Sequence, residues 1–167
     1  MSEKLIRIFI SVFVPKEIVN IKEMLKTTID TRGIKIRWIQ DGNMHLTLKF
    51  IGNTTEESID SINNAIHDLV KDTPFINLSI SGTGCFSKRD RANTLWVGIK
   101  GDLDKLEQLI LNINNKLEPL GFPIERRKFL PHITIARINP NQKKNPDISN
   151  FLNTTFMELP MKIVKIN

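Results

Sequence analysis

Cysteine is almost absent from this sequence. The chain contains one, Cys85, which excludes an internal disulfide and fits a reducing compartment. A single cysteine in an apolar stretch is more often a small buried side chain than a reactive thiol. Thiol chemistry is therefore set aside.

Long apolar runs are also missing. No segment reaches the roughly 18 consecutive apolar residues that a membrane-spanning helix needs. The apolar start, "LIRIFISVFVP", is interrupted by Arg7 and has no small-residue cleavage site after it, so it predicts a strand rather than a signal peptide. We expect a soluble, cytoplasmic protein with no membrane partner.

No linker or low-complexity segment divides the chain. Its 167 residues predict a single domain, residues 1–167, of two similar lobes. The net charge of +6 favours anionic partners such as RNA or phosphorylated small molecules. A long Lys/Arg block is absent, so charge alone gives a direction and not a function.

Apolar periodicity predicts three helices: one after Pro15, one opening at Thr54 and one from Asp102 to Leu117, with a shorter turn near residues 148–152. Thr54 and Glu57 are expected to form a capping box. Strands are predicted over residues 5–14, 35–39, 45–51, 75–81, 94–99, 132–137 and 161–166. This interleaving indicates the α+β class, and its partial repetition indicates two lobes related by an approximate two-fold.

Two of the three histidines open nearly identical strands, "HLTL" at His45 and "HITI" at His132. Side chains two residues apart in a strand share a face. Each histidine therefore lies beside a threonine, Thr47 or Thr134, while the intervening apolar residues point into the core. Two such coincidences among three histidines are improbable by chance, so the pair is a specific signal.

Two imidazoles and two hydroxyls suit displacement at phosphorus. One histidine removes a proton from the attacking oxygen and the other protonates the leaving oxygen. Threonine hydroxyls can donate hydrogen bonds to the non-bridging oxygens, where charge builds. Such chemistry needs no metal ion and no cofactor.

A metal site is the competing interpretation, because histidine is a common ligand. It lacks a third ligand with suitable spacing: Asp41 and Glu125 precede the two motifs without one. A serine triad is less favoured still, since no G-x-S-x-G sequence is present.

The two motifs, together with "IRIFISVFVP", "RWIQDGNMHLTLKFIG", "LWVGI", "LEPLGFP" and "RKFLPHITIAR", resemble the 2H phosphoesterase superfamily. The similarity is to its RNA 2′,3′-cyclic phosphodiesterase branch, also called 2′-5′ RNA ligase, and covers nearly the whole chain. It implies a bilobal α+β fold with two antiparallel sheets and outer helices around a central cleft. It also implies hydrolysis of a 2′,3′-cyclic phosphate on an RNA end to a 2′-phosphate.

The resemblance further implies residue roles. His45 would be the proton donor and His132 the proton acceptor, while Thr47 and Thr134 would hold phosphate oxygens. Arg137 matches an arginine that follows the second motif in this branch. Strict alternation sends Arg137 to the face opposite His132, so its place in the site requires a bend in the strand.

Further residues are candidates for substrate contacts. Phe9, in the first strand, is expected to stack on a nucleobase, with core packing as the alternative. Lys49 is expected to share the face of His45. The basic segments "SKRDR" at 87–91 and "ERRK" at 125–128 could follow an RNA backbone.

We expect the partners to be RNA ends or cyclic nucleotides and the protein to be a monomer. Two alternatives remain. The same site could act as a 2′-5′ RNA ligase or on 2′-5′ oligonucleotides. The chain could also be a nucleotide- or RNA-binding module without turnover, although binding alone would not need two histidines.

Overall fold

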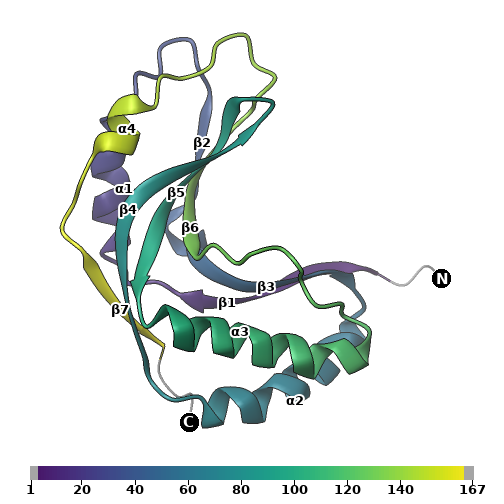
Figure 1. Ribbon diagram of the computed structural model, residues 1–167. Helices are drawn as coiled ribbons and strands as arrows, with labels where there is room; N and C mark the ends of the chain where they lie inside the picture. Colours follow the sequence, from purple (N-terminus) through teal and green to yellow (C-terminus); the bar gives the residue numbers. More distant parts are fainter. Residues whose placement is uncertain (1–3, 164–167) are drawn as a thin grey trace.

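A computed structural model describes residues 4–163 of the chain (Figure 1). These residues form four helices and seven strands, interleaved along the chain but not in strict alternation. The helices are α1 (Ile18–Lys26), α2 (Glu56–Asp72), α3 (Leu103–Leu117) and α4 (Ser149–Asn153). Short 3-10 turns lie at Asp41–Asn43 and Glu118–Leu120.

The strands pair antiparallel throughout. Their order is β1-β3-β6-β5-β4-β7, and β2 lies beside the far end of β6. The bounds are β1 (Ile6–Phe13), β2 (Ile36–Trp38), β3 (His45–Thr54), β4 (Ile76–Lys88), β5 (Arg91–Gly101), β6 (His132–Ile138) and β7 (Leu159–Ile163). The predicted α+β class with an antiparallel arrangement is confirmed.

The two expected sheets are joined in the middle. β1 and β3 form one unit, and β6, β5, β4 and β7 form the other. Between them, β3 and β6 pair through one residue on each side, Leu46 and Ile133. Because the contact is so short, the two parts diverge on either side of it, and one continuous curved sheet replaces two separate ones.

The helices cover one face of this sheet (Figure 1). α2 and α3 lie side by side beneath β1 and β3, whereas α1 and α4 lie against the part formed by β4, β5 and β6. Periodic apolar residues explain the attachment of α3, which buries Leu106, Leu109, Ile110, Ile113 and Leu117. The opposite face of the sheet carries no helix among residues 4–163 (Figure 1).

The predicted capping box of the second helix is wrong. Thr54 is the last residue of β3, and α2 is preceded by Thr55 in an extended conformation. No side chain caps the first turn; the Thr55 hydroxyl lies 3.0 Å from the Ser58 hydroxyl instead. Thr54 is buried, so the strand extends through the position that the sequence pattern assigned to the cap.

The segment "SKRDR" is not a loop but the tip of a hairpin. β4 and β5 run on to Lys88 and Arg91, and Arg89 and Asp90 form the two-residue turn, both with positive φ (52° and 60°). A two-residue hairpin turn requires this conformation, for which Gly or Asn is usual. The absence of those residues hid the hairpin in the sequence.

The last predicted strand, 161–166, corresponds to β7, which begins at Leu159 and pairs with β4. Residues 164–166 of that prediction lie outside the described residues. No helix in residues 4–163 has the length and apolar character needed to cross a bilayer.

Leu46→Ala is expected to lower the free energy of unfolding by about 2–5 kcal/mol, because the side chain is fully buried at the junction of the two parts of the sheet. Leu111→Ala is the matched control: Leu111 is 47% exposed on α3, and its change should stay within about 0.5 kcal/mol. Urea denaturation followed by circular dichroism measures both. Equal losses in the two variants would contradict the central role of Leu46.

Candidate active site

The two motifs lie on β3 and β6 and point the same way. In each strand the histidine and the threonine are half-buried, whereas the next residues, Leu46 and Ile133, are completely buried. The apolar residues face the helices. The histidines and threonines therefore lie on the helix-free face of the sheet.

The junction of the two strands fixes how the motifs meet. Because Leu46 pairs antiparallel with Ile133, continuing this register sets His45 opposite Thr134 and Thr47 opposite His132. The two histidines are then diagonal neighbours, for which the usual spacing is about 7–8 Å. The two motifs therefore lie on adjacent strands and face the same side of the sheet.

Each motif is followed by a β-bulge. Along β3, Thr47 pairs with Ser11 and Lys49 with Ile10, so Leu48 has no partner. Along β6, Thr134 pairs with Trp96 and Ala136 with Leu95, which leaves Ile135 without one. A bulge inserts one residue and reverses the alternation beyond it.

The bulges decide which side chains reach the site. Beyond them, Phe50 and Arg137, each five residues after a histidine, are exposed, while Lys49 and Ala136 are buried. Arg137 thus lies on the face of His132, as the resemblance required and strict alternation did not.

The prediction that Lys49 shares the face of His45 is wrong. Lys49 is 5% exposed, and its ammonium group donates to Asn114 Oδ1 at 2.6 Å and to the carbonyl oxygen of Pro123 at 2.8 Å. Burial lowers the pKa of Lys49, and the charge of Glu125 opposes that effect. Lys49 ties β3 to α3 and to the segment leading into β6.

A second buried lysine holds the approach to the first motif. Lys22 of α1 donates to the carbonyl oxygen of Ile39 at 2.9 Å and also contacts the Asp41 carboxylate. These bonds fix the segment that turns from β2 into β3. They therefore position the strand that His45 opens.

Both imidazoles are held in the same way. Nδ1 of His45 lies 2.7 Å from the carbonyl oxygen of Asn43, and Nδ1 of His132 lies 2.7 Å from that of Leu130. A carbonyl oxygen can only accept, so Nδ1 carries the proton in both rings. This leaves Nε2 of each histidine for proton transfer.

Aromatic side chains fix the plane of His45. Phe9 stacks on this ring with a centroid distance of 4.6 Å and an interplanar angle of 17°. Phe9 also contacts Phe50, at 5.9 Å between centroids, and remains 42% exposed. The core-packing alternative for Phe9 is excluded, because the ring lies on the exposed side of β1.

His132 has a different aromatic environment. Phe86 meets its ring edge-on at 4.9 Å between centroids, and Trp96 lies at 5.9 Å. The indole covers Gly84, where a Cβ atom would collide with the ring. Sequence reasoning missed Phe86, Trp96 and Phe50; superposing the two motifs would have revealed Phe50 as the counterpart of Arg137.

The environment of His132 lowers its pKa. Burial is the main cause, since it disfavours the charged imidazolium; the positive charge of Arg137 adds to the effect, and the hydrogen bond to Leu130 opposes it. The lowered pKa favours the neutral imidazole, in which Nε2 is the unprotonated nitrogen.

Groups of three or more metal-ligating side chains are absent from residues 4–163. Aromatic rings contact both histidines, and the charge of Arg137 acts on His132. Acid-base chemistry on an anionic substrate is what this arrangement offers.

Comparison with known families agrees with this geometry. The model of the LigT-like phosphoesterase family matches residues 11–96 and 97–167. This chain belongs to the LigT-like phosphoesterases. Each matched half of the LigT-like chain contains one histidine motif, and the predicted membership of the 2H phosphoesterases is confirmed.

Curated relatives of this LigT-like chain are named RNA 2′,3′-cyclic phosphodiesterase. A Thermotoga maritima protein is 32% identical over 132 residues, which cover 79% of this chain and 70% of that protein. A Methanocaldococcus jannaschii protein is 31% identical over 166 residues, covering 96% and 89%.

Solved structures show the same LigT-like fold. The protein TT0787 of Thermus thermophilus superposes with a TM-score of 0.72 at 24% identity and covers 93% of this chain and 84% of its own. LigT of E. coli complexed with 3′-AMP gives 0.68 at 21% identity, with 95% and 87% covered.

Arg137→Ala is expected to raise the pKa of His132 toward its ordinary value, because a positive charge that disfavours imidazolium is removed while the ring stays buried. A pH titration of the His132 ring resonances by NMR measures the shift. Arg32→Ala is the control, since Arg32 pairs with Asp30 and should leave this pKa unchanged. An unchanged or lower pKa in Arg137→Ala would refute the coupling.

Proposed function

We propose that this protein is an RNA 2′,3′-cyclic phosphodiesterase that hydrolyses a terminal 2′,3′-cyclic phosphate to a 2′-phosphate without a metal ion. The names of the curated relatives support this activity and substrate. That E. coli LigT was solved with 3′-AMP and with phosphate supports a nucleotide substrate.

One observation carries the proposal. Two histidines lie on one face of the sheet, and each is held through Nδ1 by the carbonyl two residues earlier. Nε2 is therefore the reactive nitrogen in both, and a phosphate between them can receive a nucleophile on one side and lose a leaving group on the other. A binding module would gain nothing from two imidazoles held in this way.

The lowered pKa of His132 suggests the direction of proton transfer. Neutral His132 takes a proton from water through Nε2, and the water oxygen attacks phosphorus. The bond from phosphorus to the 3′ oxygen breaks as protonated His45 gives that oxygen its proton. The products are a 2′-phosphate and a free 3′ hydroxyl, and proton exchange with solvent restores both histidines.

Hydroxyl and guanidinium groups stabilise the negative charge on the phosphate during the reaction. Thr47 and Thr134 flank the histidines in register, so their hydroxyls donate to the non-bridging oxygens, where negative charge grows. Arg137 lies on the same face and is suited to paired hydrogen bonds with phosphate. Its charge also favours an anion next to neutral His132.

In this proposal Phe9 contacts both the imidazole ring of His45 and the substrate. One face of Phe9 orients His45 through the 4.6 Å stack. Its exposed side can receive a base, because stacking on aromatic side chains is tolerant of base identity. The base-stacking role expected from the sequence stays a prediction.

His45→Ala and His132→Ala should each lower the hydrolysis of a 2′,3′-cyclic nucleotide by about 10²–10⁴, the usual contribution of general acid-base catalysis. Assays with excess chelator and product identification by NMR test activity, metal independence and the 2′-phosphate together. His67→Ala is the control, because His67 is exposed on α2. Wild-type activity in either active-site variant, or loss of wild-type activity in chelator, would overturn the mechanism.

Thr134→Val should reduce kcat by about 10², with little change in stability, because it removes one hydroxyl donor while keeping the β-branched shape of the strand residue. Steady-state kinetics with a cyclic nucleotide and thermal unfolding give the two readouts. Thr94→Val is the comparison for a buried threonine on the adjacent strand. A rise in KM with kcat unchanged would show that Thr134 binds the substrate and the transition state equally, and would contradict a role specific to the transition state.

A further inference from the structure

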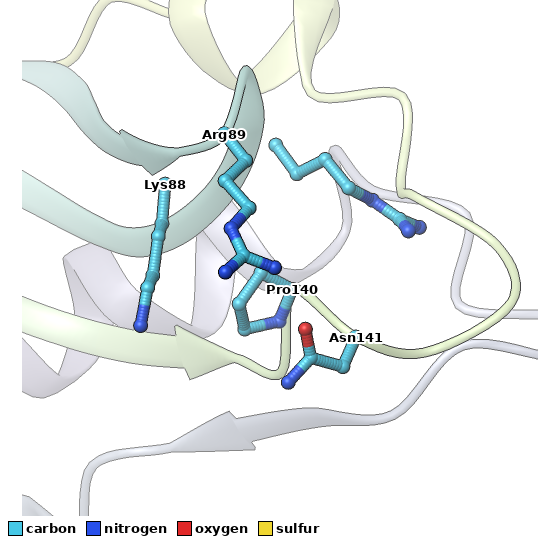
Figure 2. Close-up of a pocket in the computed structure, with 5 residues that line it drawn as sticks. Lys88, Arg89, Pro140 and Asn141 are labelled. Atoms are coloured by element: carbon cyan, nitrogen blue, oxygen red, sulfur yellow. The ribbon is translucent and has the colours of Figure 1, made fainter.

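A basic pocket lies at the tip of the β4–β5 hairpin, beyond the histidines. Its volume is about 340 Å³, and its lining residues are Lys88, Arg89, Arg91, Pro140 and Asn141. Figure 2 shows Lys88 and Arg89 descending from the hairpin toward Pro140 and Asn141 of the segment that follows β6. Three cationic side chains and no carboxylate line it.

The two walls of the pocket are fixed to each other. The guanidinium of Arg91 donates to the carbonyl oxygen of Gln142 at 2.7 Å, and Gln142 Oε1 accepts from the backbone amide of Lys35 at 3.0 Å. The hairpin turn itself is two residues long. The pocket is therefore a formed feature of the fold, in which Arg91 has a structural task.

Lys88 and Arg89 can direct their charges toward a ligand. Both are exposed, and neither forms an ion pair within residues 4–163. Asp90, the other residue of the turn, does not line the pocket. Two free cations beside a polar amide, that of Asn141, are suited to a phosphate group.

The pocket continues the line of the catalytic groups. Along β6, His132, Thr134 and Arg137 share one face, and Pro140 follows three residues later. Along β4, Lys88 lies two residues beyond Phe86, which contacts His132. The pairing of β4 with β5 shifts between Phe86 and Ser87, and the residue left without a partner is Asn93 of β5. Side chains therefore alternate normally along β4, so Lys88 and Phe86 share a face.

The pocket and the histidines lie well apart along the sheet. Eight residues separate His132 from Pro140, a span of up to about 26 Å of extended chain, with Arg137 between them. A strand whose 3′ end lies between the histidines can thus bring an upstream phosphate to this pocket.

We propose that the pocket binds a backbone phosphate several nucleotides upstream of the reacting end, so that the enzyme selects oligonucleotides over cyclic mononucleotides. This inference rests on the proposed function, because it takes the histidines as the site of the terminal phosphate. A site for free inorganic phosphate would use the same cationic side chains.

The test compares a hexaribonucleotide ending in a 2′,3′-cyclic phosphate with a cyclic mononucleotide. Wild type should show the higher kcat/KM on the hexamer. Lys88→Ala/Arg89→Ala should lower hexamer kcat/KM at least about tenfold more than mononucleotide kcat/KM, which corresponds to losing one charge-assisted hydrogen bond. It should also reduce the salt-dependence slope for the hexamer by about 0.7.

Lys100→Ala/Lys105→Ala is the control with the same change in net charge, since these lysines lie at the other end of β5 and on α3 and pair with Glu158 and Asp102. Equal loss on the hexamer in both double variants would show a general charge effect and overturn the subsite. Equal wild-type kcat/KM on hexamer and mononucleotide would overturn it as well.

Binding without turnover separates this inference from the proposed function. Fluorescence anisotropy with a labelled hexamer ending in a 2′-phosphate should show weaker binding to Lys88→Ala/Arg89→Ala than to wild type. If this holds while no cyclic substrate is hydrolysed, the subsite stands and the proposed function fails. If inorganic phosphate binds the pocket but the double substitution leaves hexamer binding unchanged, the site is one for free anions and the subsite is refuted.

Discussion

The pairing of Leu46 with Ile133 is the contact on which the site depends. Both side chains are completely buried against the helices, and this anchors the middle of each motif on the core side. Continued in antiparallel register, this pairing sets each histidine opposite the threonine of the other motif. Hydrophobic burial on one face of the sheet thereby sets the positions of the polar groups on the other face, without requiring any direct bond between the histidines.

The β-bulges turn this symmetric frame into an asymmetric site. Both strands skip a partner at the position after the threonine, Leu48 in one and Ile135 in the other, so both present the residue five places after the histidine. In the first strand this residue is Phe50, which packs against Phe9 beside His45. In the second it is Arg137, whose charge adds to the effect of burial, the main cause, in lowering the pKa of His132. Equivalent backbones therefore give the two imidazoles different electrostatic surroundings.

Much of this arrangement could be predicted from the sequence, because it depends on period-two patterns. The alternation around His45 and His132 predicted the strands, their buried residues and the shared face of histidine and threonine. Alternation could not predict the β-bulges, because a bulge has no residue signature when the extra residue is an ordinary Leu or Ile. As a result, Lys49 was predicted on the wrong face, and the place of Arg137 in the site required a bend that the sequence did not explain. Phe86 and Trp96 escaped notice because they come from the hairpin, and contacts between strands distant in sequence depend on register, which local patterns do not fix.

The near-equivalence of the two halves also explains why residues outside the motifs must decide the direction of the chemistry. The family model matches each half, and each half holds one histidine in the same tautomer. With identical surroundings, the two imidazoles would titrate alike and neither proton-transfer role would be preferred. Burial beneath Phe86 and Trp96, together with the charge of Arg137, keeps His132 neutral, whereas His45 is stacked on an exposed phenyl ring. The same asymmetry in charge continues past Arg137 to the hairpin tip, so the cationic side of the site is also the side on which an anionic strand is most readily held.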